Sequence, residues 1–215
     1  MNSGLNYFDS IIYINLAHRN DRNNEILKEL KRLEVRPEKI HRIEAVSDPL
    51  NGHRGCALSH AYALQYAIDH NLNNALILED DFTSTRSPPQ IDELLSHFIQ
   101  TLGNEWDVFL IGGNIKSFEK TPFPRINRSL IALCAHAYAV NQHYFPLLKA
   151  LFTHCYEMMQ SDLFFTLSDG KPIDQQWNYL MAKDRWYFME IFGQQRPSQS
   201  DTYLCFRDRS HTELF

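Results

Sequence analysis

Three consecutive acidic residues, Glu79, Asp80 and Asp81, directly follow a short apolar run at residues 75–78. An apolar run of this length is typical of a buried strand, and ligands in open α/β sheets gather at the carboxyl ends of strands. Adjacent carboxylates repel one another unless they share a cation, and Mg²⁺ or Mn²⁺ commonly bridges such oxygen ligands to phosphate. The triplet therefore predicts a metal and phosphate site at a strand end. The simpler alternative is an exposed acidic surface or a helix start.

A polar segment at residues 15–22 follows the first apolar run, residues 10–14. It contains Asn15, Leu16, Arg19, Asp21 and Arg22. Its position at a predicted strand end suits recognition of a nucleotide base or ribose, and the two arginines could pair with phosphate charge. The alternative is a solvated loop in which Asp21 caps the helix that follows.

A third motif, Gly-Cys-Ala-Leu-Ser-His at residues 55–60, is predicted to open a helix. Gly55 would allow a tight turn into the helix, and Ser59 and His60 would lie in its first turns, where free backbone amides attract anions. The alternative is simple capping and packing. The glycine-rich loops that hold nucleotides in other folds are absent from the sequence, which leaves phosphate binding to a bridging metal.

Composition and charge exclude several classes of protein. The chain of 215 residues is 44% hydrophobic and 22% charged, and its net charge of −5 gives no overall basic field for nucleic acid. The four cysteines, Cys56, Cys134, Cys155 and Cys205, are widely spaced and form neither a zinc-ligand pattern nor a disulfide framework. Isolated thiols of this kind favour a reducing compartment.

We expect a cytoplasmic protein. Residues 1–10 lack the apolar core of a signal peptide, and no stretch approaches the roughly 20 apolar residues that cross a bilayer. A peripheral association with a membrane on the cytoplasmic side is compatible with this expectation.

Apolar periodicity predicts an α/β fold. We expect strands at residues 10–14, 41–46, 75–78, 107–111, 131–140 and 186–192, and helices at residues 22–34, 57–70, 90–102, 142–153 and 173–182. Residues 48–55 and 114–128 are predicted to be loops, and the chain from Gly193 onward is predicted to be irregular. Strands alternate with helices through the first half, so we predict a single domain over residues 1–215, with a central, mostly parallel sheet flanked by helices.

Together these motifs resemble glycosyltransferase family 25, the group that contains lipooligosaccharide galactosyltransferases and collagen galactosyltransferases. The matching fragments are Ile14-Asn15-Leu16 with Asp21-Arg22, residues 55–60, residues 76–81, Ala137-Tyr138-Ala139-Val140, Pro172-Ile173-Asp174 and Gln199-Ser200-Asp201. Their order and approximate spacing fit over about residues 9–201. The resemblance implies a GT-A-like (Rossmann-like) fold, a UDP-galactose or UDP-glucose donor, a divalent metal (Mn²⁺ or Mg²⁺), and transfer with inversion at the anomeric carbon.

The resemblance also implies roles for particular residues. Glu79 and Asp81 resemble the metal-binding pair: Asp81 is expected to bind the metal directly, and Glu79 to ligate it or to orient its water shell. Alternation along an extended segment points these two side chains the same way. A third ligand is expected from His211, with Asp201 as its competitor, and Arg207 and Arg209 could help to close the tail over the phosphates. Asp80 is expected to hydrogen-bond the donor ribose. Asp174 is the expected general base, and the alternative is an ordinary aspartate at a helix start.

The predicted nucleotide-sugar site draws on several segments. Its residues are Asn15, Leu16, Arg19, Asp21, Arg22, Ala45, Val46, Ser59, His60, Asp80, Gly112 and Gly113. Four aromatic residues, Trp106, Tyr138, Trp177 and Trp186, are candidates for sugar stacking, although such residues more often belong to the core.

We expect the partners to be a UDP-sugar donor and an acceptor hydroxyl on a glycan or a hydroxylysine-bearing protein. Two other classes stay open: a nucleotide-sugar-binding module without turnover, and a metal-dependent phosphohydrolase. The second lacks an aspartate nucleophile motif at the first strand, where Tyr13-Ile14-Asn15-Leu16 stands.

Overall fold

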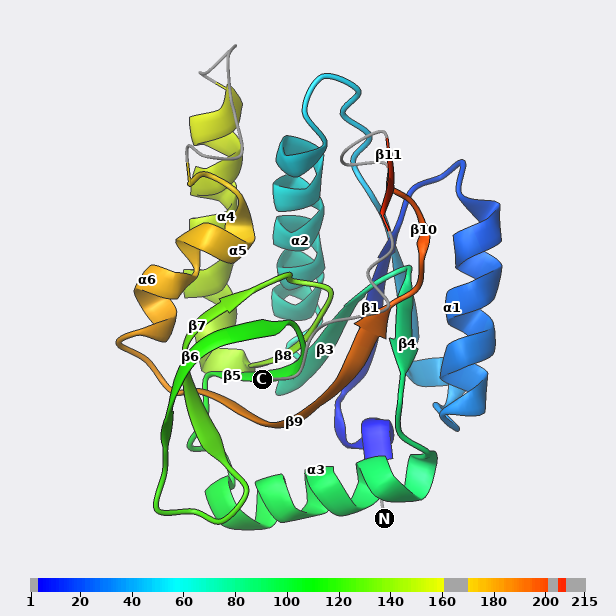
Figure 1. The fold of residues 1–215 in the computed structure, drawn as a ribbon. Coiled ribbons are helices and arrows are strands. Elements are labelled where there is room, and N and C mark those ends of the chain that lie inside the picture. The colour runs from blue at the N-terminus through cyan, green and yellow to red at the C-terminus, as the bar shows by residue number, and fades with distance from the viewer. Residues whose placement is uncertain (1–3, 161–169, 201–204, 208–215) are drawn as a thin grey trace.

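The computed structural model describes residues 4–160, 170–200 and 205–207, and its main feature is one nine-stranded sheet (Figure 1). The strands of this sheet are β1 (Ser10–Asn15), β2 (Ile40–Glu44), β3 (Asn74–Glu79), β4 (Phe82–Ser84), β5 (Val108–Gly112), β6 (Asn114–Lys120), β7 (Asn127–Leu133), β8 (Ala137–Asn141) and β9 (Trp186–Gln195). Their spatial order is β2-β1-β3-β8-β5-β9-β7-β6, with β4 paired to β9. A separate antiparallel pair joins β10 (Ser198–Ser200) to β11 (Cys205–Arg207).

Most strands of the sheet run in one direction. Strands β1, β2, β3, β5, β6 and β9 point the same way, and β4, β7 and β8 point the opposite way. Strand β8 lies between β3 and β5 and is antiparallel to both. The carboxyl ends of β1, β3, β5 and β9 therefore lie at the same end of the sheet, where ligands of α/β proteins commonly bind.

Helices cover both faces of the sheet. They are α1 (Asn20–Arg32), α2 (Gly52–Asp69), α3 (Pro88–Leu102), α4 (Phe145–Gln160), α5 (Ile173–Gln176) and α6 (Asn178–Met181), with short 3₁₀ turns η1 (Gly4–Tyr7), η2 (Pro37–Lys39) and η3 (Gln142–Tyr144). Helices α2 and α4 pack side by side on one face, and α1 lies on the other (Figure 1). Across the described residues, no helix is long and apolar enough to span a membrane.

Each central strand supplies side chains to two cores. In β3, Ala75 and Ile77 pack toward α2 and α4, whereas Leu76 and Leu78 pack toward α1 and α3. Strands β1, β5 and β8 alternate in the same manner. Because helices cover both faces of the sheet, the strands are continuous apolar runs in the sequence, which explains why the sequence predicts them well. The predicted α/β class, with a central, mostly parallel sheet flanked by helices, is confirmed.

Two predictions in the middle of the chain are wrong. The expected loop at 114–128 contains β6 and the start of β7, which pair antiparallel at the sheet edge and keep polar side chains because much of their surface is exposed. The expected strand at 131–140 is divided between β7 and β8. Cys134 adopts a φ of 70°, and this left-handed residue turns the chain between the two strands.

Several element boundaries also differ from prediction. Helix α2 begins at Gly52, inside the predicted loop at 48–55, because the Asn51 side chain accepts a hydrogen bond from the backbone N–H of Arg54. The expected helix at 173–182 forms two short helices, α5 and α6. Strand β9 continues to Gln195, where Gly193 to Gln195 pair with β4. The chain beyond Gly193 is therefore more regular than predicted.

Gly55 has a packing role rather than the predicted role of a turn into the helix. It lies within α2, where a Cβ atom would approach the backbone oxygen of Val46 to 2.5 Å and the Cβ of Asp48 to 3.2 Å. Only glycine allows the loop after β2 to lie this close to the helix. The motif at residues 55–60 thus connects α2 to the carboxyl end of β2.

We predict that Gly55→Ala destabilises the protein by about 1–2 kcal/mol in chemical denaturation. Alanine in a helix interior normally stabilises by up to about 1 kcal/mol, but overlap with backbone atoms costs roughly 1–3 kcal/mol and should prevail. Tyr62→Ala, at an exposed position of the same helix, is the control and should change the free energy of unfolding by less than about 1 kcal/mol. A Gly55→Ala protein as stable as wild type would contradict this account of the packing.

Candidate functional site

Alternation at the end of β3 separates the acidic triplet. Asp80 and Asp81 lie in the turn between β3 and β4. Glu79 continues the series that faces α2, and its carboxylate lies 3.6 Å from His60 on that helix. Asp80 continues the other series, and its carboxylate meets Arg22 on α1. The three carboxylates therefore do not converge on one point.

Asp80 is held by two donors on the α1 side. The Arg22 guanidinium donates to Asp80 Oδ1 at 2.9 Å, and the Asn15 amide donates to Asp80 Oδ2 at 2.8 Å. Asn15 is itself buried, and its side-chain oxygen accepts a hydrogen bond from Arg42 at 3.0 Å. Burial raises the pKa of Asp80, while Arg22 and Asn15 oppose that shift. Asp80 is thus already bound on both oxygens within the protein.

Glu79 and Asp81 meet at the side-chain amide of Gln195. This nitrogen lies 3.1 Å from Glu79 Oε2 and 3.4 Å from each oxygen of Asp81. Gln195 ends β9, so the contact joins the carboxyl ends of two strands that are not neighbours in the sheet. A neutral amide thereby lies between two carboxylates, as the common direction of Glu79 and Asp81 predicts.

Within the described part of the chain, Asp81 has no cationic side chain at hydrogen-bond distance. It is 8% exposed, and its distance of 3.9 Å from Arg22 is too long for a hydrogen bond. Burial, followed by the charge of Glu79, raises the pKa of Asp81 to about 7. An anionic Asp81 therefore needs additional positive charge, which neither Gln195 nor Arg22 supplies at close range.

The donor set at Glu79 and Asp81 fits a hard divalent cation. Both side chains offer carboxylate oxygens, the ligands that Mg²⁺ and Mn²⁺ prefer. Glu79 is partly open to solvent, with 28% of its side chain exposed, so the pair can be reached from outside. Asp80 does not fit this role, because Arg22 already neutralises it at short range. Glu79 and Asp81 are therefore the residues that could hold the metal.

On the α2 side, Glu79 faces a sulfur and an imidazole. Cys56, His60 and Glu79 each offer a ligand atom, and these three atoms all lie within 4.8 Å of one another. Cys56 is a free, partly buried thiol whose pKa is raised well above its usual value, mainly by burial and then by the charge of Glu79. The His60 imidazole is fully buried and hydrogen-bonds the Tyr138 hydroxyl at 2.8 Å.

Hydrogen bonds hold the loop after β2 against α2 and β1. They involve Ser59, Val46 and Ala45. The Ser59 hydroxyl donates to the carbonyl oxygen of Gly55 at 2.7 Å and accepts from the backbone N–H of Val46 at 2.8 Å. The N–H of Ala45 bonds the carbonyl oxygen of Asn15. Because α2 begins at Gly52, Ser59 and His60 lie beyond its first turns. The prediction that they lie beside free helix amides is wrong.

Residues 16–22 form the entry to α1. Arg19 occupies the N-cap position without a side-chain cap, so the alternative in which Asp21 caps the helix is wrong. The Arg19 guanidinium instead binds both oxygens of Asp21, at 2.9 and 2.7 Å, and this contact lowers the pKa of Asp21 below its usual range. Leu16 lies in the same loop and is partly buried.

Asp174, the predicted base, lies at the start of α5. Its Oδ2 accepts a hydrogen bond from the backbone N–H of Cys134 at 2.9 Å, so it stabilises the turn between β7 and β8. Its charge, with that of Glu79, contributes to the raised pKa of Cys56, so its field acts at the α2 side of the site. Asp174 therefore combines a structural contact with an electrostatic effect on Cys56.

Gly112 ends β5 beside the neighbouring strands, and Gly113 follows it directly. A Cβ atom at Gly112 would lie 2.3 Å from His136 Nε2, and Gly113 has a φ of 132°. The imidazole of His136 also bonds the carbonyl oxygen of Gly193 at 3.1 Å. These glycines allow close contact between β5, β8 and β9.

Other predicted residues fall in the core or outside the described chain. Trp106, Tyr138, Trp177 and Trp186 are all fully buried, so stacking on a sugar is excluded and the core alternative is correct. His211, the proposed third ligand, lies outside the described residues, as do Asp201 and Arg209. Arg207 belongs to β11, whose backbone pairs with β10.

Sequence reasoning missed Gln195, Arg42 and Cys56 as members of the site. Gln195 falls in the segment predicted to be irregular, although it extends a predicted strand by three residues. Arg42 lies within a predicted strand, where its reach to Asn15 depends on the pairing of β1 with β2. Cys56 is one helical turn before His60, a spacing that could have shown that both lie on one face.

One family model matches part of the chain. Residues 37–119 match the model of glycosyltransferase family 25 (LPS biosynthesis protein). The matched stretch contains the motif at 55–60 and the acidic triplet, so the resemblance is confirmed over this part of the chain. Among curated protein sequences, none matches the chain.

Similar solved structures show the fold. A glycosyltransferase involved in the glycosylation of the major capsid of PBCV-1 is 11% identical, with 83% of this chain and 80% of that chain covered and a TM-score of 0.51. A mannose-1-phosphate geranyltransferase from Thermus thermophilus is 9% identical, with 86% and 74% covered and a TM-score of 0.47. A Drosophila galactosyltransferase complex with manganese, UDP-Gal and xylobiose is 13% identical, with 65% and 51% covered and a TM-score of 0.38. At these identities the first likeness supports the GT-A-like fold alone.

The raised pKa of Asp81 predicts a stability that depends on pH in the absence of metal. In the unfolded chain this carboxyl ionises near its ordinary pKa of 3.8, whereas in the folded protein it keeps its proton up to about pH 7. Stability therefore falls as pH rises between these values and stays low above them. We expect Asp81→Asn to raise the free energy of unfolding at pH 8 by roughly 1–3 kcal/mol, with a much smaller effect at pH 4.

Denaturant unfolding in a chelator at both pH values measures this difference. Asp80→Asn is the control, because it leaves the Arg22 charge without its close partner and should destabilise by about 2 kcal/mol or more at pH 8. An Asp81→Asn protein that is less stable than wild type at pH 8 would contradict the assignment of an uncompensated carboxylate.

Proposed function

We propose that the protein is a metal-dependent glycosyltransferase that moves a hexose, galactose or glucose, from a UDP-sugar to a hydroxyl group with inversion. The observation that carries the proposal is the pair of carboxylates, Glu79 and Asp81, at the carboxyl end of β3. The family match over residues 37–119 and the GT-A-like fold support the same class of enzyme. We assign the activity to one domain over residues 1–215.

Glu79 and Asp81 would hold Mn²⁺ or Mg²⁺ at this end of the sheet. When bound, such an ion neutralises charge on the diphosphate of the departing nucleotide. Gln195 would leave its place between the two carboxylates, since its amide nitrogen lies within 3.4 Å of both. His211 is proposed as a third ligand.

The contribution of Asp80, Asn15 and Arg22 to donor binding would be mainly to hold the turn after β3 in place. Their hydrogen bonds fix the turn after β3 against the start of α1. A carboxylate oxygen that accepts one hydrogen bond keeps a second lone pair, so Asp80 can still accept a ribose hydroxyl. We place the other predicted donor contacts, Leu16, Arg19 and Asp21, at the loop that enters α1.

The loop after β2 and the end of β5 complete the proposed donor site. Ala45 and Val46 follow β2, and Gly112 ends β5 with Gly113 directly after it, at the end of the sheet where Glu79 ends β3. Ser59 would act by holding Val46 in place through its hydroxyl. His60 would act by contact with Glu79 rather than with the donor, because its side chain is 1% exposed.

The acceptor is proposed to be a hydroxyl on a glycan or on a protein that bears hydroxylysine. Inverting transfer needs a group that removes the proton from this hydroxyl on the side opposite the leaving nucleotide. Asp174 is our candidate for this base. Its charge contributes to the raised pKa of Cys56, on the α2 side of the site.

The direct test is release of UDP from UDP-galactose and UDP-glucose, with and without Mn²⁺ and with a panel of sugar acceptors. We expect release only when metal and acceptor are both present. Glu79→Gln and Asp81→Asn should each lower kcat/KM by about 10²-fold or more, since each removes a metal ligand. Glu157→Gln, at an exposed acid on α4, should behave as wild type.

Other outcomes of this assay identify the two competing classes. Binding of UDP-sugar without release under any condition would indicate a binding module. Release of inorganic phosphate would indicate a phosphohydrolase. Equal turnover with and without a chelator would refute the role of Glu79 and Asp81.

A separate prediction concerns the base. Asp174→Asn should lower kcat by about 10²–10⁴-fold with little change in KM for the donor. The asparagine oxygen can still accept from the N–H of Cys134, so the free energy of unfolding should change by less than about 1 kcal/mol. Asp69→Asn, at the exposed end of α2, is the matched control. A loss below about tenfold in Asp174→Asn would show that another residue is the base.

A further inference from the structure

We infer that Cys56, His60 and Glu79 form a second cation site, which binds a thiophilic divalent ion such as Zn²⁺. Their ligand atoms all lie within 4.8 Å of one another. Cys56 and His60 are four residues apart in α2, so they share one face of the helix, and Glu79 reaches them from the end of β3. The cysteine spacing along the sequence excluded a zinc site made of thiols, but it did not test a mixed set of ligands.

The hydrogen bonding of the His60 imidazole indicates that its Nε2 atom has a bound cation as partner. The imidazole is 1% exposed, its Nδ1 bonds the Tyr138 hydroxyl at 2.8 Å, and its buried Nε2 makes no hydrogen bond to any described residue. Nε2 lies 3.6 Å from Glu79 Oε1, beyond hydrogen-bond distance. A buried nitrogen without a hydrogen bond is costly, and a cation between it and the carboxylate would remove that cost.

Tyr138 prepares His60 for this role. Histidine ligands of metals commonly use one ring nitrogen for the ion and the other for a hydrogen bond that fixes the ring. If Nδ1–H donates to the Tyr138 oxygen, the lone pair of Nε2 is directed toward Glu79. Tyr138 is fully buried in β8, so it holds the ring in a constant orientation.

A ligand set of one sulfur, one nitrogen and one oxygen atom favours an ion of intermediate hardness, such as Zn²⁺. Zn²⁺ takes thiolate, imidazole and carboxylate ligands at about 2.0–2.3 Å, which places ligand atoms roughly 3.3–3.8 Å apart in a tetrahedron. Side-chain rotations that move the ligand atoms by about 1 Å would bring the three atoms to these separations. Three protein ligands leave a fourth position open for water or another ligand. The all-oxygen pair of Glu79 and Asp81 suits Mn²⁺ or Mg²⁺ instead.

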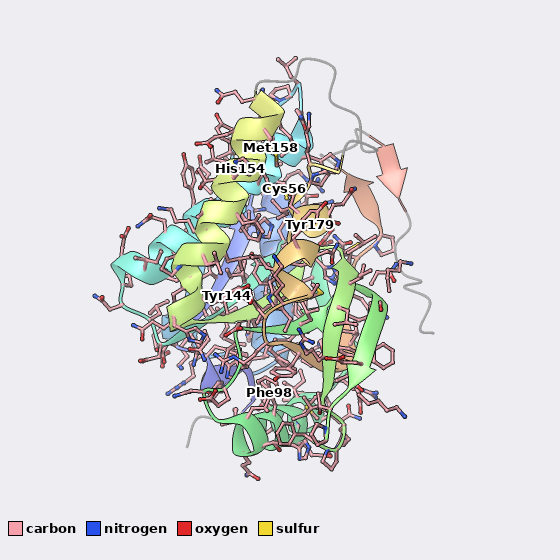
Figure 2. All side chains as sticks on the ribbon, turned by 90° about the vertical axis from the view of Figure 1, so that its left-hand side faces the viewer. Cys56, Phe98, Tyr144, His154, Met158 and Tyr179 are labelled. Atoms are coloured by element: carbon pink, nitrogen blue, oxygen red, sulfur yellow. The ribbon has the colours of Figure 1, made fainter. Side chains whose placement is uncertain are left out.

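The Cys56 side chain is accessible enough to bind the metal ion. Its side chain is only partly buried, and the cysteine carries no disulfide. In Figure 2, which views the molecule from the α4 side, Cys56 lies at the level of His154 and Met158 in the upper half of the molecule. Cys56 and Met158 pack against the same core cluster between the sheet and α4. This packing limits the movement of the α2 segment that carries two of the three ligands.

The two sites would compete for Glu79. One carboxylate cannot serve Zn²⁺ on the α2 side and keep its full role at the metal pair with Asp81. Zn²⁺ should therefore antagonise the Mn²⁺-dependent reaction, a consequence that rests on the proposed function. Binding of Zn²⁺ itself does not depend on that function.

Titration of the protein with Co²⁺ provides the test, because thiolate bound to Co²⁺ gives an absorption band in the near ultraviolet. We expect the band in wild type at one equivalent, with loss of the band on addition of Zn²⁺. Cys56→Ser should abolish it, His60→Gln and Glu79→Gln should weaken Co²⁺ binding at least about tenfold, and Tyr138→Phe should weaken it about tenfold. Cys155→Ala, at a buried thiol on α4, is the control and should keep the band.

Circular dichroism of each metal-free variant establishes that it is folded before the titration. Absence of the band in wild type, or its persistence in folded Cys56→Ser, would overturn the inference. If the band appears but no sugar is transferred under any condition, the proposed function fails and the cation site stands. If transfer occurs and Zn²⁺ inhibits wild type and Cys56→Ser equally, relative to their own zinc-free rates, the competition for Glu79 is refuted.

Discussion

The alternation of side chains at the end of β3 is the constraint on which this site depends. Successive residues of an extended segment face opposite sides of the sheet, so three adjacent acids cannot act as one cluster. Asp80 faces α1 and is neutralised by Arg22 at 2.9 Å, whereas Glu79 faces α2. Asp81, in the turn that follows, meets Glu79 again at the amide of Gln195. One tripeptide thus gives a structural anchor and a pair of carboxylates for function.

Electrostatics gives these acids different roles. A buried carboxylate is tolerated when a cation and hydrogen-bond donors compensate it, as Arg22 and Asn15 do for Asp80. Among the described residues, Asp81 has the neutral amide of Gln195 at 3.4 Å and Arg22 at 3.9 Å near its carboxylate, and burial, followed by the charge of Glu79, raises its pKa. Perturbed carboxyl groups of this kind mark candidate functional sites. Glu79 connects the pair to Cys56 and His60 on α2, so both sets of candidate cation ligands share one residue.

The sequence predicts the strands that are buried on both faces and the residues placed at their ends. The apolar runs at 10–14, 75–78 and 107–111 are distinct because α/β packing hides both of their faces. The exposed edge strand β6 and its neighbour β7 lack that signal, and the left-handed conformation of Cys134 leaves no periodic pattern in the sequence. The partners of the site are harder to predict, because they depend on pairing. Gln195 reaches Glu79 only through the pairing of β9 with β5 and β4, and no local pattern encodes that contact.

The position of a bound manganese ion tests the central claim most directly. Anomalous scattering at the manganese edge, from a crystal grown with Mn²⁺ and UDP, locates the ion without assumptions about neighbouring density. We predict one peak bonded to carboxylate oxygens of Glu79 and Asp81, with the amide of Gln195 moved from between them and Asp80 still bound to Arg22. A peak bonded to Asp80, or one distant from the end of β3, would contradict the division of the acidic triplet.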